Sequence, residues 1–242
     1  MIDSVLFDFW HTLVTFKDEE RLKLLNKRVD GFQKIFNRHG YKLTKDKIMG
    51  ILENVASTCA DIRTTEEREI PVNEMIRMVL KGINIEDGSG ILEELSQVYS
   101  DAVFSIELVL IDNVEEVLKR LKVSGIKLGI VSNTEHGTIE EEMLKRWHLY
   151  DYFDALIFSC HVGVRKPSPA IFHKVLASLK SKPENAMHVG DIPDIDVLGA
   201  KRAGIYAVYF NNNNKPYPPG LPKPDAVIED LREIFDILAQ QQ

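Results

Sequence analysis

The chain has 242 residues, of which 44% are hydrophobic and 28% charged, so it is long enough and apolar enough to bury a sizeable core. A formal net charge of −7 argues against a broad basic surface for nucleic acid. Two cysteines cannot form a disulfide framework, and no apolar run approaches the ~20 residues of a membrane helix. The N-terminus shows no signal-peptide pattern, so we expect a cytoplasmic protein. We expect it to be a monomer or homodimer, without nucleic-acid or membrane partners.

The first predicted strand covers residues 5–9, where β-branched and aromatic residues follow one another. Strand-like alternation is then absent from residue 16 to residue 107. Helical spacing of apolar residues predicts helices in this block at 17–39, 45–60, 72–81 and 90–105. We therefore expect an all-helical insert at residues 16–107.

From residue 108 onward, predicted helices and strands alternate. Strands are expected at 127–132, 155–158, 186–189, 207–210 and 226–228. Helices are expected at 114–123, 138–147, 169–179, 195–203 and 231–239. This alternation predicts an α/β fold in which residues 1–15 and 108–242 form a doubly wound parallel sheet.

Polar residues follow several of these strands. Asp8 lies at the end of the first predicted strand. Ser132-Asn133 lies at the end of the second, and Asp191 follows the strand at 186–189. Lys166 precedes a predicted helix. Because ligands bind at the carboxyl ends of parallel strands, we expect these side chains to meet at one edge of the sheet.

These segments resemble the four signatures of the haloacid dehalogenase superfamily. Phe7-Asp8 through Thr12-Leu13 is similar to the first signature, and residues 129–133 are similar to the second. Residues 163–172 match the third closely, and residues 189–204 match the fourth. Each match is weak to moderate alone, but the four occur in the family's order. The resemblance implies a Rossmann-like core, a helical cap at residues 16–107 and an active site in the cleft between them.

The resemblance also implies a Mg²⁺ site. Asp8 would be both nucleophile and metal ligand, the backbone carbonyl of Trp10 would be a second ligand, and Asp191 a third. Asp196 would act through water or orient Lys166. Carboxylate and carbonyl oxygens are the ligands that Mg²⁺ prefers.

A small phosphorylated molecule is the implied substrate. Ser132 and Asn133 would bind its phosphoryl group, Thr12 would help to position it, and Lys166 would balance charge during attack by Asp8. A carboxylate can attack phosphorus in this way to give an aspartyl phosphate.

The first signature departs from the family pattern at Trp10 and His11. In the family's phosphatases, an aspartate two residues after the nucleophile protonates the leaving group and activates water. An indole N–H cannot replace it. Such acid–base help is typically worth about 10²–10⁴-fold in rate, so we expect slow turnover of poor leaving groups unless another residue substitutes. His11, with a pKa near neutrality, is the first candidate. Other possible substitutes are Glu66, Glu67, Glu69 and His136.

Three functions are consistent with these residues. The first is a Mg²⁺-dependent phosphatase that acts through an aspartyl phosphate on Asp8. The second is a metal-independent hydrolase similar to the 2-haloacid dehalogenases. The third is a weakly active or non-catalytic relative that binds a phosphorylated ligand. The family's dehalogenases lack the paired aspartates of the fourth signature, so retention of Asp191 and Asp196 favours the metal-dependent phosphatase.

Overall fold

The computed structural model describes residues 1–86 and 90–241. The chain divides into two compact units: an α/β unit of Met1–Thr15 with Val109–Gln242, and a helical unit of Phe16–Leu108. Among the described residues, no helix combines the length and the apolar character that crossing a membrane requires.

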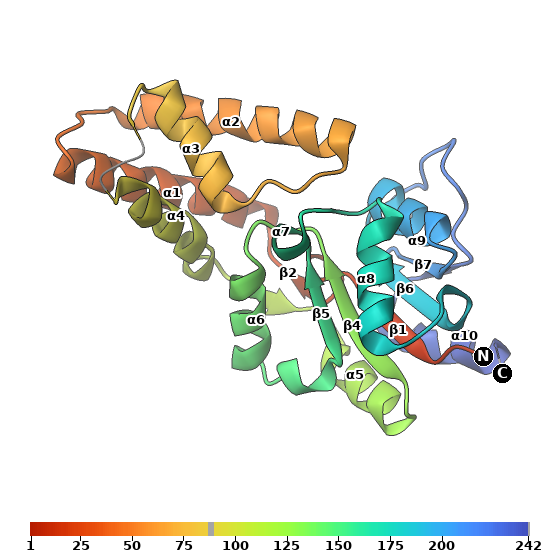
Figure 1. Ribbon diagram of the computed structural model, residues 1–242. Helices are drawn as coiled ribbons and strands as arrows, with labels where there is room; N and C mark the ends of the chain where they lie inside the picture. Colours follow the sequence, from red (N-terminus) through yellow and green to blue (C-terminus); the bar gives the residue numbers. More distant parts are fainter. Residues whose placement is uncertain (87–89, 242) are drawn as a thin grey trace. The chain divides into compact units, whose positions relative to one another are not determined.

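A six-stranded parallel sheet forms the centre of the α/β unit (Figure 1). Its order is β5 (Ala155–Phe158), β4 (Lys127–Ser132), β1 (Ser4–Phe7), β6 (Ala186–Gly190), β7 (Tyr206–Phe210) and β8 (Ala226–Ile228). Every residue of β1 is buried, because this strand has neighbours on both sides and helices on both faces. This sheet confirms the predicted doubly wound α/β fold.

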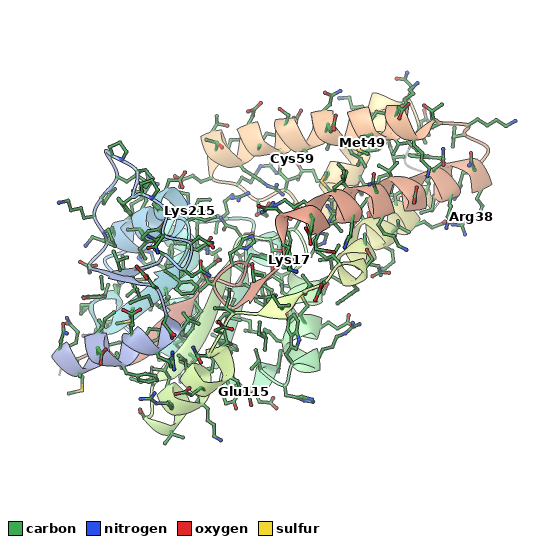
Figure 2. The ribbon with its side chains drawn as sticks, turned by 180° about the vertical axis from the view of Figure 1, so that it is seen from behind. Lys17, Arg38, Met49, Cys59, Glu115 and Lys215 are labelled. Carbon is green, nitrogen blue, oxygen red and sulfur yellow. The ribbon has the colours of Figure 1, made fainter. Side chains whose placement is uncertain are left out.

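Helices cover both faces of the sheet. On one face lie α8 (Pro169–Leu179) and α9 (Leu198–Arg202), and on the other lie α5 (Val114–Val123) and α10 (Ile234–Gln240) (Figures 1 and 2). Gly129 lets α8 approach β4 closely, since a Cβ there would lie 2.8 Å from Val175 and 2.9 Å from Leu6. The remaining α-helices of this unit are α6 (Gly137–Arg146) and α7 (Ser159–Val162).

The helical unit contains α1 (Asp18–Arg38), α2 (Lys45–Glu66), α3 (Val72–Gly82) and α4 (Ile91–Asp101). Their apolar faces share one buried cluster that includes Phe32, Phe36 and Leu95. In Figure 2, Lys17 and Arg38 mark the two ends of α1. Helix α2 extends to Glu66, beyond the predicted end at residue 60, and the predicted helix at 90–105 becomes 3₁₀-helical at Ala102–Ser105.

Two strands of two residues each were not predicted. β2 (Val14–Thr15) and β3 (Val109–Leu110) pair in an antiparallel manner, with Thr15 opposite Val109. They are too short to produce an alternating sequence pattern. The helical unit therefore leaves and rejoins the α/β unit at neighbouring residues.

The predicted helix at 195–203 also has a different start. A π-helical turn covers Pro193–Val197, and α9 follows directly from Leu198. Short 3₁₀-helices also lie at Tyr150–Tyr152, Pro183–Asn185 and Leu231–Glu233.

Candidate active site

Asp8 lies directly beyond the central strand of the sheet. Its backbone N–H donates to the carbonyl of Val189 at 2.9 Å, which extends the pairing of β1 with β6 by one step. The chain then turns tightly, because the N–H groups of Leu13 and Val14 both donate to the carbonyl of Phe9. His11 has a φ of 60°, in the left-handed region that few non-glycine residues adopt. Asp8 is thus held at the carboxyl end of the sheet and is only 6% exposed.

Lys166 joins Asp8 to Asp196. Its Nζ donates to Asp8 Oδ1 at 2.5 Å and to Asp196 Oδ1 at 2.7 Å, and the lysine side chain is 1% exposed. Burial lowers the pKa of Lys166, but the negative charges of Asp196 and Asp8 outweigh it and hold the pKa above its ordinary value. The lysine is therefore a fixed positive charge beside Asp8.

The carboxylate of Asp196 is held by several contacts. Its Oδ2 accepts from the backbone N–H of Ile192 at 3.0 Å, and its Oδ1 lies 3.0 Å from Nε2 of His188. A Cβ at Gly190 would lie 2.3 Å from Asp196 Cγ, so only glycine leaves room for this carboxylate. Burial raises the pKa of Asp196, but the charge of Lys166 and the hydrogen bond to His188 lower it below its ordinary value. Asp196 and Lys166 therefore form a buried ion pair.

Asp191 completes a group of three carboxylates. Oxygen atoms of Asp8, Asp191 and Asp196 all lie within 4.8 Å of one another. Oδ1 of Asp191 is buried and has no hydrogen-bond partner among the described residues. Burial, together with the charges of Asp8 and Asp196, raises the pKa of Asp191 to about 8. Burial also raises the pKa of Asp8 to about 7, although Lys166 opposes this. A buried carboxylate oxygen without a partner, beside two others, fits a hard divalent cation such as Mg²⁺.

The residues after β4 support the site from the opposite side of β1. The side chain of Asn133 clamps the backbone of Lys166: Oδ1 accepts from the lysine N–H at 2.8 Å, and Nδ2 donates to its carbonyl at 2.9 Å. Ser132 is fully buried, and its hydroxyl donates to Glu140 Oε1 at 3.2 Å. Thr12 Oγ1, in the loop that carries Asp8, is buried without a hydrogen-bond partner among the described residues.

Trp10 occupies the position of the missing aspartate and makes a contact that the sequence did not suggest. Its indole Nε1–H donates to Glu140 Oε1 at 2.7 Å. Glu140, on α6, is 0% exposed. Burial raises the pKa of Glu140 to about 8, in spite of the hydrogen bonds that its carboxyl group accepts. One buried carboxyl group therefore connects the loop after β1 to the end of β4.

The possible substitutes for the missing aspartate lie in different places. His11 Nδ1 lies 2.9 Å from Thr15 Oγ1, within the same loop. His136 is buried directly before α6 in the α/β unit. Three belong to the helical unit: Glu66 pairs with Arg68, Glu67 ends α2, and buried Glu69 pairs with Arg63.

Two residues of this site were missed in the sequence. Glu140 lies in a run of three glutamates, which is typical of a solvated helix surface, and only its spacing with buried Ile139, Met143 and Leu144 hints that it faces inward. The other is His188. Its ring is buried against Phe172, with ring centres 4.9 Å apart, and it contacts Asp196. Its place in a buried strand two residues before Gly190 gave no sign of this contact.

Comparisons with known proteins agree with the α/β fold. The chain is 34% identical to phosphoserine phosphatase of Thermus thermophilus over 121 residues, which is 50% of this chain and 48% of that protein. It spans about half the length of the curated relatives that it matches. A solved structure of a HAD phosphatase from Thermococcus onnurineus is 28% identical, with a TM-score of 0.67 and 98% of each chain covered.

The fold is also shared with a 2-haloacid dehalogenase from Pseudomonas syringae pv. Tomato, which is 21% identical, with a TM-score of 0.74 and full coverage of both chains. The family model of the haloacid dehalogenase-like hydrolases matches residues 2–204. This match includes Asp8, Lys166 and all three clustered carboxylates. The chain therefore belongs to the haloacid dehalogenase-like hydrolases, a family of enzymes.

Proposed function

We propose that this protein is a Mg²⁺-dependent phosphatase that cleaves a small phosphate monoester through an aspartyl phosphate on Asp8. The observation that carries the proposal is the contact of buried Lys166 with Asp8, beside the unpartnered oxygen of Asp191. In this proposal, Asp8 is the nucleophile, Lys166 supplies a fixed positive charge and Asp191 offers an oxygen ligand to a cation. The phosphatase names of similar proteins support the same chemistry.

In this proposal, Asp8, Asp191 and the backbone carbonyl of Trp10 would hold Mg²⁺, and Asp196 would act through water or orient Lys166. The ion supplies positive charge that balances the negative charge of the phosphoryl oxygens. Asp8 uses one carboxylate oxygen to attack phosphorus, and the bond from phosphorus to the ester oxygen breaks. The departing oxygen keeps the electron pair and takes a proton from His11, the donor that we propose in place of the missing aspartate. Water then attacks phosphorus, which releases phosphate and restores the Asp8 carboxylate.

The surrounding residues keep this geometry fixed. Lys166 stays positively charged and opposes the repulsion between the Asp8 carboxylate and an anionic phosphoryl group. Asn133 holds the backbone of Lys166, and Asp196 orients its ammonium group. Thr12 Oγ1 is buried without a hydrogen-bond partner among the described residues, and in this proposal it would donate to a phosphoryl oxygen.

Hydrolysis of para-nitrophenyl phosphate, with Mg²⁺ and with EDTA, tests the proposal. We expect activity with Mg²⁺, loss of activity in EDTA and no activity in Asp8→Asn. The exposed Asp194 gives a matched control, and Asp194→Asn should remain active. No activity in any condition would contradict a phosphatase, and release of halide from a 2-haloacid would then identify dehalogenase chemistry.

A further inference from the structure

Glu140 Oε1 accepts hydrogen bonds from two separate parts of the site. Trp10 belongs to the loop after β1 and donates at 2.7 Å, whereas Ser132 ends β4 and donates at 3.2 Å. The neighbouring glutamates of α6 behave differently, since Glu142 lies at the surface and pairs with Arg146. Glu140 alone of these points into the interior.

The loop that carries Asp8 contacts Glu140 through Trp10. Trp10 follows Asp8 by two residues, and its ring packs edge-on against Phe9, with centres 5.1 Å apart. A part-buried indole N–H that loses its acceptor is costly, so the hydrogen bond to Glu140 favours the observed orientation of Trp10. The same oxygen fixes the hydroxyl of Ser132, next to the Asn133 that clamps Lys166.

We propose that Glu140 is a positioning residue, which holds Trp10 and Ser132 on one oxygen and so fixes the nucleophile loop against the end of β4. The role in catalysis rests on the proposed phosphatase function, whereas the anchoring of Trp10 does not. Glu140 does not supply the carboxylate of the missing aspartate. It accepts a hydrogen bond from the tryptophan that stands at that position.

The test compares Glu140→Gln, which keeps an accepting oxygen, with Glu140→Leu, which has none. Two readouts are needed. The first is kcat and KM for para-nitrophenyl phosphate, normalised to folded protein. The second is the indole N–H resonance of Trp10 in a Trp147→Phe background, where it belongs to the single tryptophan of the chain. Hydrogen bonding moves this proton resonance downfield.

We expect Glu140→Gln to keep the downfield resonance and a kcat within about threefold of the parent, and Glu140→Leu to lose both, with kcat reduced roughly 10- to 100-fold by misplacement of the reacting groups. Leu144, buried on the same helix, supplies a matched control. Leu144→Ala should lower the melting temperature without changing kcat or KM of the folded fraction.

Two results would overturn the proposal. An unchanged resonance in Glu140→Leu would show that the shared oxygen does not anchor Trp10, and unchanged kinetics would show that it does not position the nucleophile loop. Loss of turnover in Glu140→Gln with the resonance retained would show that Glu140 acts by transferring a proton, not by positioning.

A second variant covers a failure of Glu140→Leu to fold. Trp10→Phe removes the indole donor and keeps an aromatic ring. If Glu140 acts through Trp10, Glu140→Gln and Glu140→Ala should differ in kcat in the parent but much less in the Trp10→Phe background. Equal differences in both backgrounds would overturn the proposal. If the parent hydrolyses no phosphate ester, the phosphatase function fails, and the indole resonance alone then decides whether Glu140 anchors Trp10.

Discussion

The Nζ atom of Lys166 lies 2.7 Å from Oδ1 of Asp196, and each side chain is 1% exposed. Removing one partner of such a pair destabilises the folded protein, because the other charge is left buried without compensation. We therefore expect Lys166→Met to lower the free energy of unfolding by about 3–5 kcal/mol and to abolish hydrolysis. Urea unfolding measures the first effect. Lys174→Met, at an exposed position on α8, is the control and should change neither quantity. An unfolding midpoint equal to the parent's would disprove the expected dependence on Lys166.

Mg²⁺ binding should strengthen as pH rises. The pKa values of Asp8 and Asp191, about 7 and about 8, mean that protons compete with a cation for both carboxylates at neutral pH. We expect the apparent affinity, measured by calorimetry, to increase between pH 6 and pH 9. Asp191→Asn should weaken binding strongly at every pH. Asp194→Asn should bind as the parent does, and an affinity that falls with rising pH would contradict this account.

The titration of Glu140 should appear in the stability of the metal-free protein. Its pKa is raised from 4.5 to about 8, so the folded state holds this proton more tightly than the unfolded chain. The stability that Glu140 contributes is complete below pH 4.5 and is lost as pH rises toward 8. Glu140→Gln has no such loss. Between pH 5 and pH 8, its unfolding free energy should improve relative to the parent by roughly 4 kcal/mol.

Denaturant unfolding in EDTA at several pH values measures this difference. Asp8 and Asp191 titrate in both proteins, so their contributions cancel in the comparison. A constant difference between Glu140→Gln and the parent would show that the Glu140 carboxyl group has an ordinary pKa.

His11 is the proposed proton donor to the leaving group. Asparagine tolerates the left-handed φ of 60° at this position better than alanine, so His11→Asn removes the imidazole with little change to the loop. We expect kcat for an alkyl phosphate to fall about 100-fold or more, because its leaving oxygen needs a proton. Turnover of para-nitrophenyl phosphate should fall much less. An equal decrease for both esters would exclude His11 as the donor.

Gly31 and Gly50 provide a paired test of packing in the helical unit. A Cβ at Gly31 would lie 2.2 Å from Cγ1 of Val98, so the Val98 side chain or the two helices α1 and α4 would have to shift. Gly31→Ala should lower stability by about 1–3 kcal/mol. At Gly50, nothing lies within 4 Å of an added Cβ, and Gly50→Ala should raise stability by about 0.5–1 kcal/mol through helix propensity. Thermal unfolding measures both, and equal effects of the two substitutions would contradict this packing.

The sequence predicted the sheet well because its strands are buried on both faces. Such strands give continuous apolar runs, and residues 127–132 show one that matches β4. Polar residues after such runs then placed Asp8, Ser132 and Asp191 at one edge of the sheet. The convergence of these segments followed from the parallel topology alone.

Contacts made by side chains that point inward from a helix could not be predicted in this way. Glu140 carries the charge of a surface residue, and its partners Trp10 and Ser132 are 130 and 8 residues away in sequence. The π-helical turn at Pro193–Val197 was missed for a similar reason. It brings Asp196 back to the N–H of Ile192, a local arrangement that apolar spacing does not encode.

The pairing of Thr15 with Val109 has a consequence for how this architecture can change. The helical unit begins and ends next to these two paired residues. The two segments of the α/β unit could therefore be joined directly without it. A short turn in place of Phe16–Leu108 would leave the six-stranded sheet and its carboxylates connected in their present order. We therefore expect that evolution can exchange, lengthen or delete the helical segment while the carboxylates of the proposed active site are inherited unchanged.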